Sequence, residues 1–167
     1  ILNVTPDSFS DGGLAYSPEA AADRAEQLVA EGADILDLGA ESTRPGAEPI
    51  DAATELSRLL PAIAAVRRRL PDIPLSVDTY KAEVAAACIA AGADVINDVE
   101  GGSHEADPTG SPMARTCARL GCPLILMHRR KEPNYKDFWP EILAETSHLI
   151  QRARAAGLPP AQLWVDP

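Results

Sequence analysis

The sequence predicts an α/β protein with a parallel sheet, because short apolar runs alternate with longer amphipathic segments along its whole length. Strands that are apolar on both faces and alternate with helices are typical of a parallel sheet covered by helices. A second observation is an internal repetition. The segments AEGADILDLG (30–39) and AAGADVINDV (90–99) match at an offset of 60 residues, and each is a helix end, a glycine and a strand. The candidate strands are 1–4, 35–38, 75–77, 95–96, 124–127 and 163–165.

Amphipathic segments that precede the glycines are the candidate helices. The first begins with Ser17 as a cap, Pro18 at the first helical position and Glu19 in the first turn. Ala21, Ala25, Leu28 and Val29 then share one face. The other expected helices cover 56–66, where Pro61 could cause an irregularity, 81–91, 113–120 and 139–156.

Two topologies fit such a parallel sheet, an open doubly wound sheet or a closed barrel. The GxGxxG motif that usually follows the first strand of the open sheet is absent. Polar residues at the carboxyl ends of the strands are instead typical of a (β/α)8 (TIM) barrel. Because six strands are visible, we expect residues 1–167 to be one partial barrel domain, with two further strands and about 100 residues after Pro167. The polar residues at or beside the ends of the apolar runs are Asn3, Asp37, Asp78, Asn97, His128 and Asp166.

The composition excludes several classes of partner. The net charge is −10, so the surface would repel nucleic acid and anionic membranes. No apolar run approaches the ~20 residues of a membrane helix, and no signal peptide is visible. Cys88, Cys117 and Cys122 form no metal or CxxC pattern, which favours reduced, buried thiols in a cytoplasmic protein.

The strand ends carry the residues best suited to bind a ligand. The carbonyl of Asn3 could ligate a hard cation such as Mg2+, or its amide could tie down the following loop. Asp78, Asn97 and Asp166 would form an acceptor-rich wall for a ligand with several N–H donors. The alternative for Asp78 is a cap on the next helix, shared with Thr79.

Two long segments after strands could also contribute. Residues 5–13 exceed the ~2–6 residues typical of a βα connection, so they could close over a ligand or form a solvated loop. Ser42, Thr43 and Arg44 place two hydroxyls beside a guanidinium, which could bind a phosphate or carboxylate. Arg44 could otherwise pair with Glu41 on the surface.

The segment 127–139 is a basic island in an acidic chain. His128 could be a ligand or an acid–base group, or the segment could be a solvated loop. Met127, if it points inward, would offer a polarisable contact to a flat ring.

Four segments together resemble the dihydropteroate synthase family, folate-pathway transferases that sulfonamides inhibit. The resemblance implies a (β/α)8 barrel that joins p-aminobenzoate to 6-hydroxymethyl-7,8-dihydropterin pyrophosphate and releases pyrophosphate with Mg2+ present. It also implies a homodimer for the full-length protein. LILMH (124–128) and LWVDP (163–167) add support. The four segments are ILNVTPDSFSDGG (1–13), DLGAESTRPGA (37–47), LSVDT (75–79) and VINDVEGG (95–102).

The resemblance also implies roles for individual residues. Pyrophosphate would leave first, and the amine of p-aminobenzoate would attack the cationic pterin methylene. Asp11 and Asp78 would stabilise that cation, while Arg44 and the metal would stabilise the leaving anion. The implied site residues are Asn3 for metal and pyrophosphate, Asp78, Asn97, Met127 and Asp166 for the pterin, and Thr5, Pro6, Phe9, Ser42 and Thr43 for the p-aminobenzoate pocket.

Two alternatives share the pterin wall. The pterin-binding domain of a corrinoid-dependent methyltransferase would not need residues 5–13 or 42–46, and a non-catalytic relative would bind without turnover. The family carries a Ser-x-Lys and an Arg-x-His motif on its last two strands, which this chain lacks. We therefore expect these 167 residues alone to be inactive.

Overall fold

The computed structural model describes residues 1–5, 17–41, 48–101, 111–130, 132 and 134–166. Within them, six strands form one sheet in the order β1-β2-β3-β4-β5-β6, and every neighbouring pair is parallel. The strands are β1 Leu2–Asn3, β2 Leu36–Gly39, β3 Leu75–Asp78, β4 Val95–Asp98, β5 Leu124–Met127 and β6 Leu163–Asp166. The helices are α1 Pro18–Ala30, α2 Ala52–Arg69, α3 Ala82–Ala90, α4 Pro112–Leu120, α5 Phe138–Ala155 and the short 3-10 helix η1 Pro160–Gln162.

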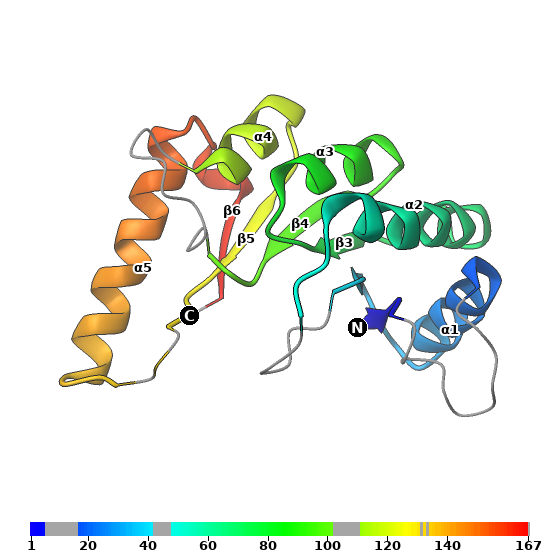
Figure 1. The fold of residues 1–167 in the computed structure, drawn as a ribbon, viewed down its shortest axis with the longest axis horizontal. Helices are drawn as coiled ribbons and strands as arrows, with labels where there is room; N and C mark the ends of the chain where they lie inside the picture. The colour runs from blue at the N-terminus through cyan, green and yellow to red at the C-terminus, as the bar shows by residue number, and fades with distance from the viewer. Residues whose placement is uncertain (6–16, 42–47, 102–110, 131, 133, 167) are drawn as a thin grey trace.

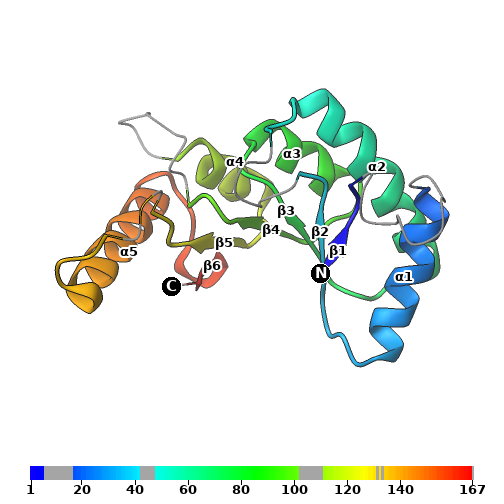
Figure 2. The same ribbon diagram turned by 60° about the horizontal axis from the view of Figure 1, so that its bottom comes forward.

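The strand order decides between the two predicted topologies. A doubly wound sheet reverses its strand order and carries helices on both faces. Here the order is sequential, and each helix from α1 to α4 contacts the next one along the chain. Figures 1 and 2 show the helices arrayed along the outer side of a curved sheet. The predicted α/β class is confirmed, and the arrangement is that of a (β/α)8 barrel, left open in the described residues between β1 and β6.

Local signals in the sequence account for the helix ends. Ser17 caps α1, where its hydroxyl accepts a hydrogen bond from the Ala20 amide at 3.1 Å. Asp51 caps α2 in the same way, with a 2.7 Å bond from the Thr54 amide. Pro61 lies inside α2, but the helix continues to Arg69, so the predicted irregularity does not end it.

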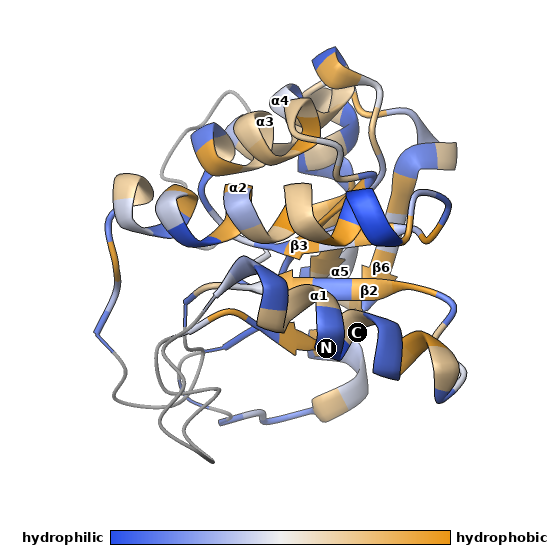
Figure 3. Cartoon of the chain, turned by 90° about the vertical axis from the view of Figure 1, so that its right-hand side faces the viewer, coloured by the Kyte–Doolittle hydropathy of each residue, from blue (hydrophilic) through white to orange (hydrophobic). Residues whose placement is uncertain are grey.

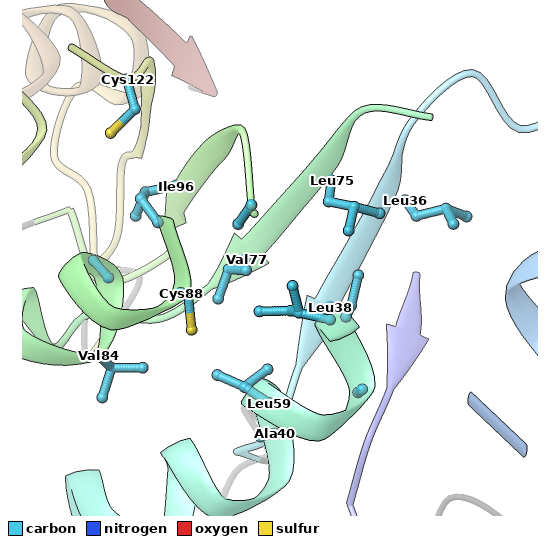
Figure 4. Packing of buried hydrophobic residues seen from close by; sticks show 14 of the residues in the cluster. Leu36, Leu38, Ala40, Leu59, Leu75, Val77, Val84, Cys88, Ile96 and Cys122 are labelled. Carbon is cyan, nitrogen blue, oxygen red and sulfur yellow. The ribbon is translucent and has the colours of Figure 1, made fainter. Parts of the chain in front are cut away.

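The main core lies between the sheet and the helices. The ladder places Leu38, Val77, Ile96 and Leu124 in register on one face, and all four are fully buried. Figure 4 shows several of these side chains meeting Leu59 of α2, and Figure 3 shows that the strands are mostly apolar while the helices carry both polar and apolar bands. Side chains alternate between the two faces of a strand, so the residues that precede and follow each of these four in its strand point to the concave side of the sheet.

Two further expectations concern the state of the cysteines and the presence of a membrane-spanning helix. Cys88, Cys117 and Cys122 are all free and buried, as predicted. Burial raises the pKa of the Cys88 thiol to about 12, so it stays protonated at neutral pH. Among the described residues, no helix combines the length and apolar character needed to cross a membrane.

We predict that Leu59→Ala lowers the free energy of unfolding by about 2–5 kcal/mol, because it opens a cavity under the centre of the sheet. Leu59 is 0% exposed, whereas Leu143 on α5 is 62% exposed, so Leu143→Ala is the matched control and should change little. Urea denaturation of the full-length protein measures both. Equal losses for the two variants would contradict this packing.

Candidate active site at the carboxyl ends of the strands

The sheet register brings the predicted site residues of the first four strands onto one row. Asn3 pairs with Gly39, Gly39 with Asp78, and Asp78 with Asn97. Paired residues of neighbouring strands project their side chains to the same face of a sheet. This row is out of phase with buried Leu38 and Val77, so it faces away from the helices, into the concave side of the sheet.

The row continues onto the last two strands. Asn97 pairs with Ile125, and two residues further along β5, Met127 pairs with Asp166 of β6. Met127 and Asp166 therefore lie on the same concave face as Asn97, one step nearer the carboxyl ends. The register thus turns Met127 toward the concave side, the orientation in which it could contact a flat ring. Asp78, Asn97 and Met127 are half-buried, while Asn3 and Asp166 are exposed.

Gly39 keeps space open between Asn3 and Asp78. A Cβ atom at Gly39 would lie 3.6 Å from Oδ2 of Asp78 and 3.8 Å from Oδ1 of Asn3. A larger side chain would fill the gap between these two oxygen atoms. The amide oxygen of β1 and the carboxylate of β3 thus border one small space at the rim.

Asp37 is a site residue to which sequence reasoning gave no role, although it was visible as a polar residue inside an apolar run. Its Oδ2 accepts a hydrogen bond from Nδ2 of Asn97 at 3.2 Å, which turns the amide oxygen of Asn97 away from Asp37. Its Oδ1 is buried without a hydrogen-bond partner, as is the hydroxyl of Ser76, which pairs with Asp37 in the ladder. The concave face therefore has unused acceptor capacity.

Burial and neighbouring carboxylates raise the pKa of Asp78 to about 7. Desolvation is the largest cause, followed by the negative charges of Asp37, Glu55, Asp98 and Glu41. A ligand that donates N–H groups to Asp78 would favour its ionised form. The predicted alternative, that Asp78 caps α3, is wrong, because the cap position is Lys81 and no side chain caps that helix.

Several predicted site residues lie outside the described residues, and their roles stay predictions. They are Pro6, Phe9 and Asp11 after β1, and Ser42, Thr43 and Arg44 after β2. Thr5 is described, and it lies half-buried two residues after β1.

His128 points away from this row. It follows Met127 in the chain, and its Nε2 lies 2.7 Å from Oε2 of Glu145 on α5. Arg130 also bonds Glu145, and Arg129 pairs with Glu100. Hydrogen bonds from Arg130 and His128 lower the pKa of Glu145 to about 2. His128 and Arg130 are thus tied to α5, and Arg129 is tied to the segment that follows β4.

A cavity of about 340 Å3 lies beside these ion pairs. It is bordered by Glu100, Gly101, His128 and Arg129 from the segments after β4 and β5, and by Glu145 and His148 from α5. Its lining includes His128, which the sequence offered as a possible ligand or acid–base group, but no residue of the row on the concave face.

The fold and the row together define a class: a barrel-type α/β protein whose strand ends carry carboxylate and amide acceptors, which are suited to a ligand rich in N–H donors. The chain belongs to the pterin binding enzyme family, whose model matches residues 1–167. The family resemblance in the sequence is therefore confirmed.

Relatives of known identity agree with this family. The chain is 44% identical over 167 residues to a dihydropteroate synthase of Bacillus subtilis, of which it spans 56%. It matches a dihydropteroate synthase of Clostridium difficile, solved in the presence of pteroic acid, with a TM-score of 0.88 and 40% identity over 99% of this chain and 61% of that one. It matches a dihydropteroate synthase of Xanthomonas albilineans with 4-aminobenzoic acid at a TM-score of 0.88 and 42% sequence identity, over 99% of this chain and 59% of that one. The chain thus spans somewhat more than half the length of these relatives.

We predict that Asp78→Asn stabilises the protein at alkaline pH. The native pKa of Asp78 is raised from 3.8 to about 7, so its contribution to stability is present at acidic pH and is lost as the pH rises from about 4 to about 7. The variant should gain roughly 4 kcal/mol over the wild type at about pH 8, and about 1–2 kcal/mol at about pH 5.

Urea denaturation at the two pH values measures both gains. Asp72→Asn, in the turn before β3, is the matched control, because Asp72 is exposed. A gain that is larger at the acidic pH would contradict the assignment of a raised pKa to Asp78.

Proposed function

We propose that the full-length protein is a dihydropteroate synthase, which joins p-aminobenzoate to 6-hydroxymethyl-7,8-dihydropterin pyrophosphate. The observation that carries the proposal is the shared row of Asp78, Asn97 and Asp166 on one face of the sheet, in a member of the pterin binding enzyme family. The two solved relatives above contain pteroic acid and 4-aminobenzoic acid, which are the product type and the amine substrate of this reaction.

The pterin would bind along this row. Its ring N–H and amino groups are donors, so they would bond the carboxylates of Asp78 and Asp166 and the amide oxygen of Asn97. The hydrogen bond from Asn97 to Asp37 supports this orientation of the amide. Met127 would contact the face of the ring through its thioether. Acceptors on three different strands, β3, β4 and β6, would fix the orientation of the ring.

Asn3 would hold Mg2+ together with oxygen atoms of the substrate. Its Oδ1 is a hard donor beside the space that Gly39 leaves open. Among the described residues, no three His, Cys, Asp or Glu side chains are arranged to hold a metal. Mg2+ is commonly bound by one or two protein oxygens together with substrate phosphates. When bound, Mg2+ would neutralise charge on the pyrophosphate.

The chain's own residues would then favour ionisation of the substrate. The bond between the methylene carbon and the pyrophosphate oxygen breaks, and its electron pair leaves with pyrophosphate. Arg44 would bind the leaving anion, while Asp78 and Asp11 would stabilise the methylene cation. The lone pair of the p-aminobenzoate nitrogen forms the new C–N bond, and the nitrogen then loses a proton. Thr5, Pro6, Phe9, Ser42 and Thr43 would line the pocket of the amine.

We also propose a cytoplasmic location and a homodimer for the full-length protein. Three buried free thiols support a reducing compartment. The family resemblance supports the dimer, which sedimentation of the purified protein would test.

We predict that sustained release of pyrophosphate by the full-length protein requires p-aminobenzoate, which consumes the methylene cation. We also predict that Asp166→Asn lowers kcat/KM for the pterin substrate about ten- to a hundredfold, because a charged acceptor is lost. Asp72→Asn is again the control and should leave the rate unchanged. Steady-state assays of pyrophosphate release measure this. Binding of pteroic acid without any turnover would contradict the proposal and favour a non-catalytic pterin-binding protein.

A further inference from the structure

A partly buried ion cluster lies beside the row and takes no part in the proposed chemistry. Nζ of Lys81 donates hydrogen bonds to Oε2 of Glu41 at 2.5 Å and to Oε2 of Glu55 at 2.6 Å. The hydroxyl of Tyr80 donates to the other oxygen of Glu41 at 3.0 Å, and the Lys81 ammonium lies 4.2 Å from the centre of the Tyr80 ring. We call these four residues, Glu41, Glu55, Tyr80 and Lys81, the Lys81 cluster.

The Lys81 cluster is well shielded from solvent. The side chain of Glu55 is 1% exposed, and those of Lys81 and Glu41 are 15% and 14% exposed. Burial alone lowers the pKa of Lys81, but the hydrogen bonds to Glu41 and Glu55 outweigh it and raise the pKa above its ordinary value. Lys81 is therefore charged at neutral pH. Its ammonium faces two carboxylates and an aromatic ring, so it is engaged by protein groups rather than directed at a ligand.

The Lys81 cluster joins three segments at the rim of the site. Lys81 is the cap residue of α3, three residues after Asp78, and Glu55 is in the first turn of α2. Glu41 lies two residues beyond Gly39, the last residue of β2 in the ladder. One small cavity is lined by Asp78 together with Glu41, Glu55 and Tyr80. The cluster is therefore adjacent to the proposed pterin wall but outside the sheet hydrogen bonds that hold it.

Stability alone does not explain this arrangement. Desolvation of a buried carboxylate such as that of Glu55 costs several kcal/mol, and apolar residues of similar volume often stabilise a protein as well as a buried ion pair does. The ion pair instead fixes the orientation of the Glu41 side chain, because Tyr80 and Lys81 each bond one of its carboxylate oxygens. The backbone of Asp78, by contrast, is held between Gly39 and Asn97 by the ladder, and the Lys81 cluster acts on Asp78 through the charges of Glu41 and Glu55.

We propose that Lys81 is a positioning residue that fixes the path of the chain as it leaves β2, by holding Glu41 against α2 and the start of α3. The inference rests on the proposed function, in which Arg44, three residues after Glu41, binds the pyrophosphate. It assigns Lys81 to the alignment of the reacting groups and not to the binding of the pterin ring.

The test compares Lys81→Met with the double variant Lys81→Met/Glu55→Gln in the full-length protein. Lys81→Met should lower the melting temperature, because Glu55 is left buried without its cation. It should also lower kcat/KM for the pterin pyrophosphate about tenfold or more. Glu55→Gln in that background should recover most of the melting temperature but not the rate, because Glu41 still lacks its ammonium partner. Affinity for pteroic acid, measured by calorimetry, should stay within about threefold of the wild type in the double variant, because it keeps the net charge of the cluster beside Asp78 and the ladder holds the backbone of the row.

Two further variants serve as controls. Lys81→Arg keeps the charge and should recover part of the rate. Arg69→Met removes a cation that joins Asp23 and Glu26 of α1 to α2, away from the strand ends, and should leave kcat/KM unchanged. Recovery of rate and melting temperature together in the double variant would overturn the proposal, as would a wild-type rate in Lys81→Met.

Hydrogen exchange separates this inference from the proposed function. If the wild-type protein releases no pyrophosphate, the proposed function fails, but the position of Glu41 is still measurable. The peptide containing Gly39–Glu41 should exchange faster in the double variant than in the wild type, and the peptide containing the β4 residues should not. Unchanged exchange at Gly39–Glu41 would overturn the role of Lys81 whatever the activity.

Discussion

The in-register parallel pairing of the six strands is the constraint on which the rest of the molecule depends. Because side chains alternate along a strand, the register that buries Leu38, Val77 and Ile96 under the helices must also turn Asp78 and Asn97 to the opposite face. A slip of one residue in β2 or β3 would turn Asp37 or Asp78 toward the helices and an apolar residue toward the concave side. The apolar core thus specifies the polar row, and residues far apart in the chain converge without any contact of their own.

Carboxylates gathered at the strand ends destabilise the fold, because they are partly buried and repel one another. Burial and four neighbouring carboxylates keep Asp78 close to half-protonated near neutral pH. One of these carboxylates, Asp37, is bonded by Asn97, and two others are bonded by Lys81. The carboxylates at the strand ends therefore repel one another. A ligand that donates N–H groups to them would reduce this repulsion. Burial of the apolar core between the sheet and the helices offsets this repulsion.

Sequence reasoning predicted the part of this arrangement that local signals determine. Apolar runs and glycine-terminated helices indicate the parallel sheet, and the polar residue at each strand end identifies Asp78, Asn97 and Asp166. The hydrogen bond between Asp37 and Asn97 was not predictable, because it joins β2 to β4 across β3, between residues 60 positions apart in the chain. Lys81 was visible only as the start of a helix, since its partners, Glu41 and Glu55, come from other segments. His128 ends an apolar run as the site residues do, yet the alternation directs it to α5.

A crystal structure of the full-length protein with 6-hydroxymethylpterin tests the central claim most directly, because it locates the ligand on one face of the sheet or elsewhere. The register predicts that the ring lies on the concave face, with its N–H donors within hydrogen-bond distance of Asp78, Asn97 and Asp166 and its face against Met127. A pterin bound on the helix side, for example in the cavity beside His128, would contradict the assignment of the strand-end row as the active site.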